Sequence, residues 1–151
     1  MLDSDIQKAV EELDVTMVEL NFLWTIFYEN EPSITRLAAL TFLDPSTVTQ
    51  VIARLKKKKL VEISKKEHDQ RYSYVKLSSK GDEIRKKSIV FNNKNIIGFF
   101  HLKVNTKEEK EKAKAAFDFL RDINLHFHGT EYVQWTDTLR EKLQKDFLDH
   151  K

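Results

Sequence analysis

The sequence predicts a mainly α-helical fold that carries one small β-hairpin. Apolar residues recur at helical spacing along most of the chain, and alternating apolar residues over 60–66 and 72–78 indicate two short strands. Only three glycines and two prolines occur among 151 residues, which leaves little room for a β architecture with many turns. A chain of this length forms one domain, or one domain with helical extensions.

The N-terminal part predicts one long amphipathic helix or two successive ones. Thr16-x-x-Glu19 has the spacing of a capping box, so we expect a break at Asp14-Val15 and a new helix from Thr16 to Glu29. Glu31-Pro32-Ser33 then ends that helix and starts the next. The apolar residues that alternate by three and four are Ile6, Val10, Leu13, Met17, Leu20, Trp24 and Phe27.

Residues 33–57 predict two short helices joined by a tight turn. Ser33 can cap the first helix, Asp44 is a good N-cap for the second, and Pro45 suits the first helical position. One face of the second helix is apolar, at Val48, Val51, Ile52 and Leu55. The opposite face carries groups that can hydrogen-bond base edges or phosphates, at Ser46, Thr47, Thr49, Gln50, Arg54 and Lys57.

Helices are also predicted after the hairpin. Ser78 or Ser79 opens a long helix that extends to about Leu102, and Thr106-x-x-Glu109 is a second capping box. Gly129 is expected to stop the helix that follows, and Thr130 to cap the last one. Both late helices carry apolar stripes.

Charge is unevenly distributed along the chain. Residues 54–87 contain thirteen Lys or Arg and five Asp or Glu, a net charge of +8, whereas the whole chain carries only +2. A basic block within a folded domain favours contact with a phosphate backbone. The alternative is a solvated lysine-rich surface, but the position of the block at the end of a polar helix and in a hairpin favours nucleic acid.

Several function classes are disfavoured by the sequence. There is no cysteine, which excludes disulfides, thiol catalysis and thiol redox sensing. The N-terminus lacks the pattern of a secretory signal, and no apolar run approaches the ~20 residues of a membrane helix, so we expect a cytoplasmic protein. His126 and His128 diverge on a helix and make a poor metal pair. We expect no enzyme activity, no metal and no cofactor.

The segment 33–81 resembles the MarR family of bacterial winged-helix transcription regulators. The hairpin carries Asp69-Gln70-Arg71 and ends at Leu77-Ser78-Ser79-Lys80-Gly81. The close match to the family covers about a third of the chain. The resemblance implies a winged helix-turn-helix over 16–80. It also implies N-terminal (1–15) and C-terminal (81–151) helices that pair two subunits in a two-fold homodimer. Within the family, the run Phe22–Ile26 and the C-terminal half look similar to bacillar regulators of protease production and sporulation.

The resemblance implies a sequence-specific DNA-binding regulator, a repressor that binds an inverted-repeat operator in double-stranded DNA. The recognition helix enters the major groove, and Asp69 orients Arg71 so that its guanidinium enters the minor groove, where the negative potential is concentrated. The alternative is a winged-helix module that binds proteins and not DNA. The expected DNA-binding residues are Arg36, Ser46, Thr47, Thr49, Gln50, Arg54, Lys57, Lys65, Lys66, Asp69, Arg71 and Tyr72.

The chain departs from the family pattern at two positions. Lys59 occupies the place of the glycine that usually ends the recognition helix. Because a non-glycine residue in a left-handed cap is disfavoured by roughly 1 kcal/mol, we expect the end of this helix to be altered. Ile63 falls where an arginine is usual in the first wing strand. The first helix is also shorter than is typical, so the C-terminal helices are expected to form more of the dimer interface.

Family members often bind a small aromatic effector between the DNA-binding and dimer lobes. Aromatic side chains that could line such a cleft are Trp24, Phe27, Tyr28, Phe91, Phe99 and Phe100. The alternative is plain core, because aromatic residues at helical spacing commonly pack inside the fold.

Overall fold

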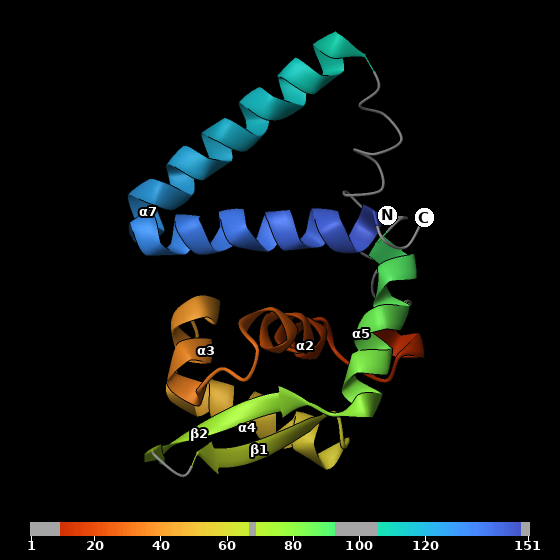
Figure 1. The fold of residues 1–151 in the computed structure, drawn as a ribbon, viewed down its shortest axis with the longest axis vertical. Helices are drawn as coiled ribbons and strands as arrows, with labels where there is room; N and C mark the ends of the chain where they lie inside the picture. Colours follow the sequence, from red (N-terminus) through yellow and green to blue (C-terminus); the bar gives the residue numbers. More distant parts are fainter. Residues whose placement is uncertain (1–9, 67–68, 93–105, 149–151) are drawn as a thin grey trace. The chain divides into compact units, whose positions relative to one another are not determined.

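The computed structural model describes residues 10–66, 69–92 and 106–148 (Figure 1). Side chains are described for all of these residues except 66, 69–70, 89–92 and 143–148. The chain divides into two compact units, Met1–Asn95 and Ile96–Lys151. The first unit contains α2 (Met17–Glu29), α3 (Ile34–Thr41), α4 (Pro45–Lys57), β1 (Val61–Lys66), β2 (Asp69–Leu77) and α5 (Ser79–Asn92). The second contains α7 (Lys107–Leu148). The predicted mainly helical fold with one antiparallel hairpin is confirmed.

The predicted caps form at the N-terminal ends of α2 and α3. The Thr16 amide donates to Glu19 Oε2 at 2.8 Å, and the Glu19 amide donates to Thr16 Oγ1 at 3.1 Å, which completes the capping box. Ser33 Oγ accepts the Arg36 amide at 3.1 Å. The chain turns between the two helices through Asn30 and Glu31, both with positive φ. Local sequence therefore sets where both helices begin.

Helix α4 begins as predicted but ends differently from the expectation. Asp44 is its N-cap and Pro45 its first residue. At its end Lys59 adopts a left-handed φ of 61°. The Leu60 amide donates to Leu55 O at 2.9 Å and the Lys59 amide to Lys56 O at 2.9 Å, the two bonds of a Schellman motif. The expectation of an altered helix end is wrong, because these bonds hold the turn despite the lysine side chain.

The hairpin forms the wing, and its second strand also hydrogen-bonds to the segment that precedes α3. Val61 pairs with Leu77 and Ile63 with Val75, and the register shifts between Ser64 and Lys66. Strand β2 begins at residue 69, before the predicted 72, because pairing continues beyond the apolar alternation that marked the strand. On the other edge of β2, the Val75 amide donates to Pro32 O at 3.0 Å. The wing is thereby attached to the segment between α2 and α3.

The core of the first unit lies where α2, α3, α4 and the hairpin meet. The predicted apolar face of α4 is fully buried, with no residue more than 1% exposed. It packs in one cluster with α2, α3 and the base of the wing. The residues of this cluster include Phe22, Leu23, Ile26, Leu37, Val48, Val51, Ile52, Leu55, Leu60, Val61 and Val75.

The start of α5 is fixed against the turn that ends α4. The Ser78 amide donates to Leu60 O at 3.0 Å, and Ser78 Oγ donates to Lys59 O at 2.7 Å. The Gly81 amide donates to Ser78 Oγ at 3.0 Å. A Cβ on Gly81 would lie 2.0 Å from Leu60 O, so only glycine permits this close approach. The Ser-Ser-Lys-Gly end of the hairpin is therefore a packing motif.

The described part of the second unit, residues 106–148, consists of two helical arms. Thr106 and Glu109 form the predicted capping box, with the Glu109 amide 3.2 Å from Thr106 Oγ1. Gly129 breaks the helix as predicted, with φ 79° and ψ 177°. The arms fold back on each other, since Arg121 Nη2 lies 3.2 Å from Asp137 Oδ2 across the break. No helix in the described ranges is long and apolar enough to cross a membrane. The predicted end of the preceding helix near Leu102 lies outside the described residues.

Replacing Lys59 by glycine should stabilise the first unit. Glycine adopts the left-handed conformation of residue 59 without a Cβ clash, so we expect Lys59→Gly to raise the free energy of unfolding by about 1 kcal/mol. Chemical denaturation measures the change. Lys56→Gly, inside the exposed face of α4, is the control and should cost about 1 kcal/mol. Destabilisation by both variants would contradict the left-handed turn.

Candidate nucleic-acid interface

The polar face of α4 is exposed, as the sequence predicted. Ser46, Gln50 and Lys57 lie one or more turns apart on the same face, and all are exposed. Thr49 and Arg54 flank this line and are also exposed, whereas Thr47 is half-buried. The helix therefore presents a polar strip on the side opposite its apolar face.

The hydroxyl groups at the start of α4 are engaged within the helix. Thr47 Oγ1 donates to Asp44 Oδ2 at 2.6 Å, and Ser46 Oγ donates to Asp44 Oδ1. Thr49 Oγ1 donates to Pro45 O at 2.8 Å. The Ser46 and Thr47 hydroxyls, with the amides of both residues, hold the pKa of Asp44 well below its usual range. Asp44 is thus a carboxylate at neutral pH.

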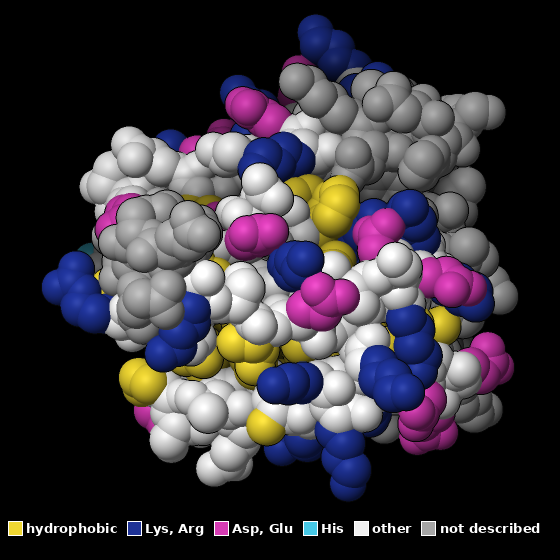
Figure 2. All heavy atoms as spheres, turned by 60° about the horizontal axis from the view of Figure 1, so that its bottom comes forward, with side chains coloured by type: hydrophobic (Ala, Val, Ile, Leu, Met, Phe, Trp, Pro, Cys, Tyr) yellow, Lys and Arg dark blue, Asp and Glu magenta, His cyan; other side chains and the backbone are white. Residues whose placement is uncertain are grey.

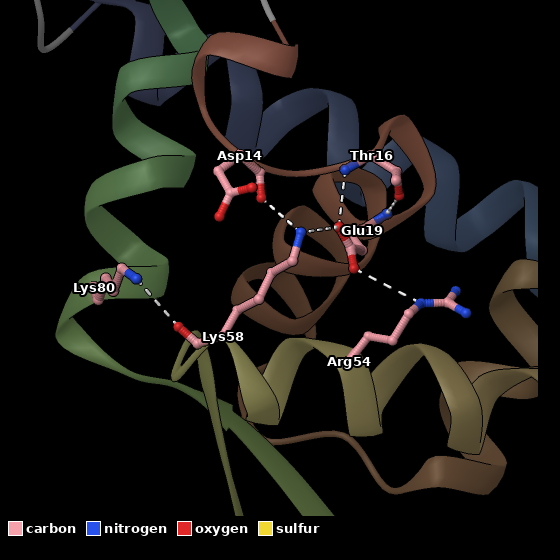
Figure 3. A network of polar contacts seen from close by, with 6 residues as sticks. All are labelled: Asp14, Thr16, Glu19, Arg54, Lys58 and Lys80. Carbon is pink, nitrogen blue, oxygen red and sulfur yellow. Dashed lines mark hydrogen bonds and ion pairs between the residues drawn. The ribbon is translucent and has the colours of Figure 1, made fainter.

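The C-terminal part of α4 is tied to α2 by a buried acid. The Glu19 side chain is only 1% exposed, and its Oε2 lies 3.1 Å from Lys58 Nζ (Figure 3). Lys58 Nζ also donates to Asp14 O at 2.6 Å. Arg54 Nε approaches Glu19 Oε1 at 3.7 Å, while the Arg54 side chain stays half exposed. Sequence reasoning missed Lys58 and this link, although it identified Glu19 as a capping residue.

The contacts around Glu19 keep it ionised. Burial alone raises the pKa of this carboxyl group. The hydrogen bond from the Thr16 amide, the hydrogen bond and charge of Lys58, and the charge of Arg54 lower it by more. The net pKa of Glu19 therefore lies below its ordinary value, and a carboxylate is the form that the fold stabilises.

The wing presents exposed side chains beside α4. Lys65, Arg71 and Tyr72 are exposed, and the Arg71 guanidinium lies 5.9 Å from the Tyr72 ring centroid. The side chains of Lys66 and Asp69 lie outside the described set. Figure 2 shows this side of the molecule, where Lys and Arg side chains are spread with acidic side chains between them. The surface is therefore mixed, with basic groups on both the helix and the wing.

Arg36, another predicted DNA contact, forms an ion pair inside the unit. Its Nε donates to Glu29 Oε2 at 2.8 Å, with the Arg36 side chain 35% exposed. This ion pair joins α3 to the end of α2. Arg36 therefore has a structural partner in addition to any contact with a ligand.

Three of the proposed effector-binding aromatics, Trp24, Phe27 and Tyr28, pack on one another, and Trp24 and Phe27 also contact α5. Trp24 stacks on Tyr28 with centroids 5.6 Å apart, and the Arg85 guanidinium lies 3.6 Å from the Phe27 centroid. Trp24 Nε1 donates to Ser88 Oγ at 3.0 Å. The side chain of Phe91, and all of Phe99 and Phe100, lie outside the described set. The effector cleft remains a prediction.

A winged helix-turn-helix with an exposed polar second helix defines a class, the DNA-binding transcription regulators. Residues 5–88 match the family described as transcriptional regulator SarA/Rot. The chain belongs to this family of MarR-like winged-helix regulators, and it is a transcriptional regulator and not an enzyme. The resemblance inferred from residues 33–81 is confirmed.

Relatives and solved structures agree with this assignment. The HTH-type transcriptional regulator Hpr of Geobacillus sp. (strain WCH70) is 22% identical over 148 residues, covering 98% of this chain and 73% of the relative. The reduced form of MarR from E. coli has the same fold, with a TM-score of 0.64 at 21% identity, covering 78% of this chain and 86% of that one. A mutant of E. coli MarR complexed with operator DNA gives a TM-score of 0.63 at 20% identity, covering 78% and 84%.

The buried Glu19 should make stability depend on pH in the acid range. Its pKa is lower in the folded than in the unfolded chain, so its contribution is complete above the unfolded pKa of about 4.5 and is lost as pH falls through the folded pKa. Glu19→Gln should cost about 2 kcal/mol at pH 7, the value of hydrogen bonds to a charged group. The difference from wild type should shrink below pH 4.5.

Denaturant unfolding from pH 3 to pH 7 measures this difference. The matched control is Glu62→Gln, because Glu62 is an exposed acid paired with Lys76 at 3.1 Å. An exposed pair contributes at most about 1 kcal/mol. A Glu19→Gln effect that is the same at every pH would show that the ionised carboxylate is not the stabilising form.

Proposed function

We propose that this protein is a sequence-specific repressor that binds an inverted-repeat operator as a homodimer. Helix α4 enters the major groove, and the wing, through Arg71, enters the adjacent minor groove. The observation that carries the proposal is the exposed polar face of α4 in the same unit as exposed basic residues of the wing. The cytoplasm is the compartment that this function requires.

The dimensions of α4 suit a major groove. Its 13 residues give a rod about 20 Å long, and B-DNA offers a major groove about 12 Å wide that admits a helix. The apolar face is buried in the core, so Gln50 and Lys57 are on the side that can approach DNA. A MarR mutant of the same fold is known in complex with operator DNA, which supports the same docking here.

The second unit supports the homodimer. The first arm of α7 exposes large apolar side chains, among them Phe119 at 67% and Phe127 at 71%. Exposed apolar surface of this kind favours association. Two subunits related by a two-fold axis would place two α4 helices in successive major grooves, about one helical turn or ~10 bp apart.

Two substitutions on α4 separate base recognition from phosphate attraction. Gln50→Ala should reduce the preference for a selected operator over random DNA by about 1–3 kcal/mol, because it removes a base contact. Lys57→Ala should weaken binding to both DNAs alike and lower the salt slope by about one unit. Mobility-shift titrations at two salt concentrations, with sedimentation to count subunits per site, measure these effects.

Three outcomes would contradict the proposal. If the protein binds no DNA even at low salt, the fold serves a protein partner. If Gln50→Ala leaves the sequence preference unchanged, α4 is not the recognition helix. One stable monomer per site at micromolar concentration would exclude the homodimer.

A further inference from the structure

The polar side of the N-terminal half of α4 has no hydroxyl hydrogen available for a ligand. Its three hydroxyl groups, on Ser46, Thr47 and Thr49, each donate within the helix, to Asp44 or to Pro45 O. A serine or threonine hydroxyl has one hydrogen and two lone pairs. The groups that they meet here, a carboxylate and a carbonyl, can only accept. The hydrogens must therefore come from the hydroxyls, and only lone pairs remain for an incoming group.

The backbone amides at this end of α4 are also already hydrogen-bonded. The Ser46 and Thr47 amides both donate to Asp44 Oδ1 at 3.0 Å. A helix N-terminus with open amides attracts phosphate, but here the Asp44 carboxylate occupies them and adds a negative charge. Phosphate oxygens only accept hydrogen bonds, so neither these amides nor the three hydroxyls offer them a donor.

Bases present a different set of groups in the major groove. Adenine N6 and cytosine N4 carry amino groups that donate, whereas guanine N7 and O6 and thymine O4 accept. A surface of hydroxyl lone pairs beside a carboxylate is complementary to the amino groups only. Gln50, one turn after Ser46 on the same face, carries both a donor and an acceptor and is free of this restriction.

We propose that Asp44 sets the base preference of this protein by taking up the donor hydrogens of Ser46 and Thr47. With Thr49, these residues then act only as acceptors and select adenine or cytosine amino groups at the bases they contact. Asp44 is a positioning residue in this scheme, and its low pKa keeps it ionised at neutral pH. The inference rests on the proposed entry of α4 into the major groove.

The substitution Asp44→Asn separates this role from helix capping. Asparagine caps a helix about as well as aspartate, so the fold should be retained. Two amides hold the oxygen at the Oδ1 position, which places the new amide nitrogen beside Thr47 Oγ1. That nitrogen donates to Thr47 and cannot accept from it. The Thr47 hydrogen is then released, and Thr47 can donate to guanine or thymine.

The experiment begins with selection of bound duplexes from a random library by wild type and by Asp44→Asn. In the wild-type site, single adenines are replaced by purine and single cytosines by 2-pyrimidinone, which removes the amino group. In a second series, single purine bases are replaced by their 7-deaza analogues, which removes the N7 acceptor. Removing an amino group contacted by Thr47 should weaken wild type about 5-fold or more. The same replacement should not weaken Thr47→Val further. The control is Thr25→Val, which should behave as wild type. The Thr25 hydroxyl donates to Asn21 O in the same way, but it lies on α2.

The outcomes distinguish this inference from the proposed function. A selected site whose amino groups couple to Thr47, with guanine or thymine newly accepted by Asp44→Asn at that position, supports it. Coupling of Thr47→Val to the 7-deaza replacements, or an unchanged preference in a folded Asp44→Asn protein, overturns it and leaves the proposed function standing. Failure of wild type to select any sequence overturns both.

Discussion

The geometry of the winged-helix unit depends on the contacts of the buried Glu19 carboxylate. An ionised acid that is 1% exposed must be compensated by several donors, because an unpaired buried charge is very costly. The Thr16 amide, Lys58 Nζ and Arg54 Nε surround it. Since Thr16 starts α2 and Lys58 follows the last turn of α4, one carboxylate fixes the distance between two helices.

The turn after α4 is bonded to the segment that joins the wing to α5. Lys58 O accepts from Lys80 Nζ at 3.2 Å, and Lys59 O accepts from Ser78 Oγ at 2.7 Å. Gly81 then packs against Leu60 O, where a larger residue would clash. Three consecutive carbonyls thus contact the junction between β2 and α5. Helix α4, the wing and α5 are therefore joined at one place, and a left-handed lysine is tolerated there because the surrounding hydrogen bonds hold the turn.

Local interactions made the helix boundaries predictable. Thr16 with Glu19, and Asp44 with Pro45, are only one to three residues apart, so their chemistry is visible in the sequence. Interactions between distant residues were not predictable in this way. Lys58 hydrogen-bonds to Glu19, which lies 39 residues earlier in the chain. The Val75 amide likewise bonds to Pro32 O, in a segment that the sequence shows only as a connection between two helices.

The polar face of α4 was predicted from spacing, because the buried apolar residues leave the other side exposed. The state of its hydroxyls was not predicted. Capping residues and base-contacting residues are of the same types, and only the contacts with Asp44 and with Pro45 O show which hydroxyl hydrogens are already used. The expectation of an altered helix end at Lys59 was wrong for a related reason, since a conformational preference of roughly 1 kcal/mol is smaller than the combined tertiary contacts.

A double-mutant cycle on Glu19 and Lys58 tests whether the Glu19 carboxylate holds α4 against α2. Glu19→Gln and Lys58→Met, singly and together, are compared in free energy of unfolding at pH 7. We expect a coupling energy of about 1–3 kcal/mol, since these residues share a buried charge network. The same cycle measured on operator affinity should show coupling of the same sign. Simple addition of the two effects on stability would contradict a role of the Glu19 carboxylate in holding α4 against α2.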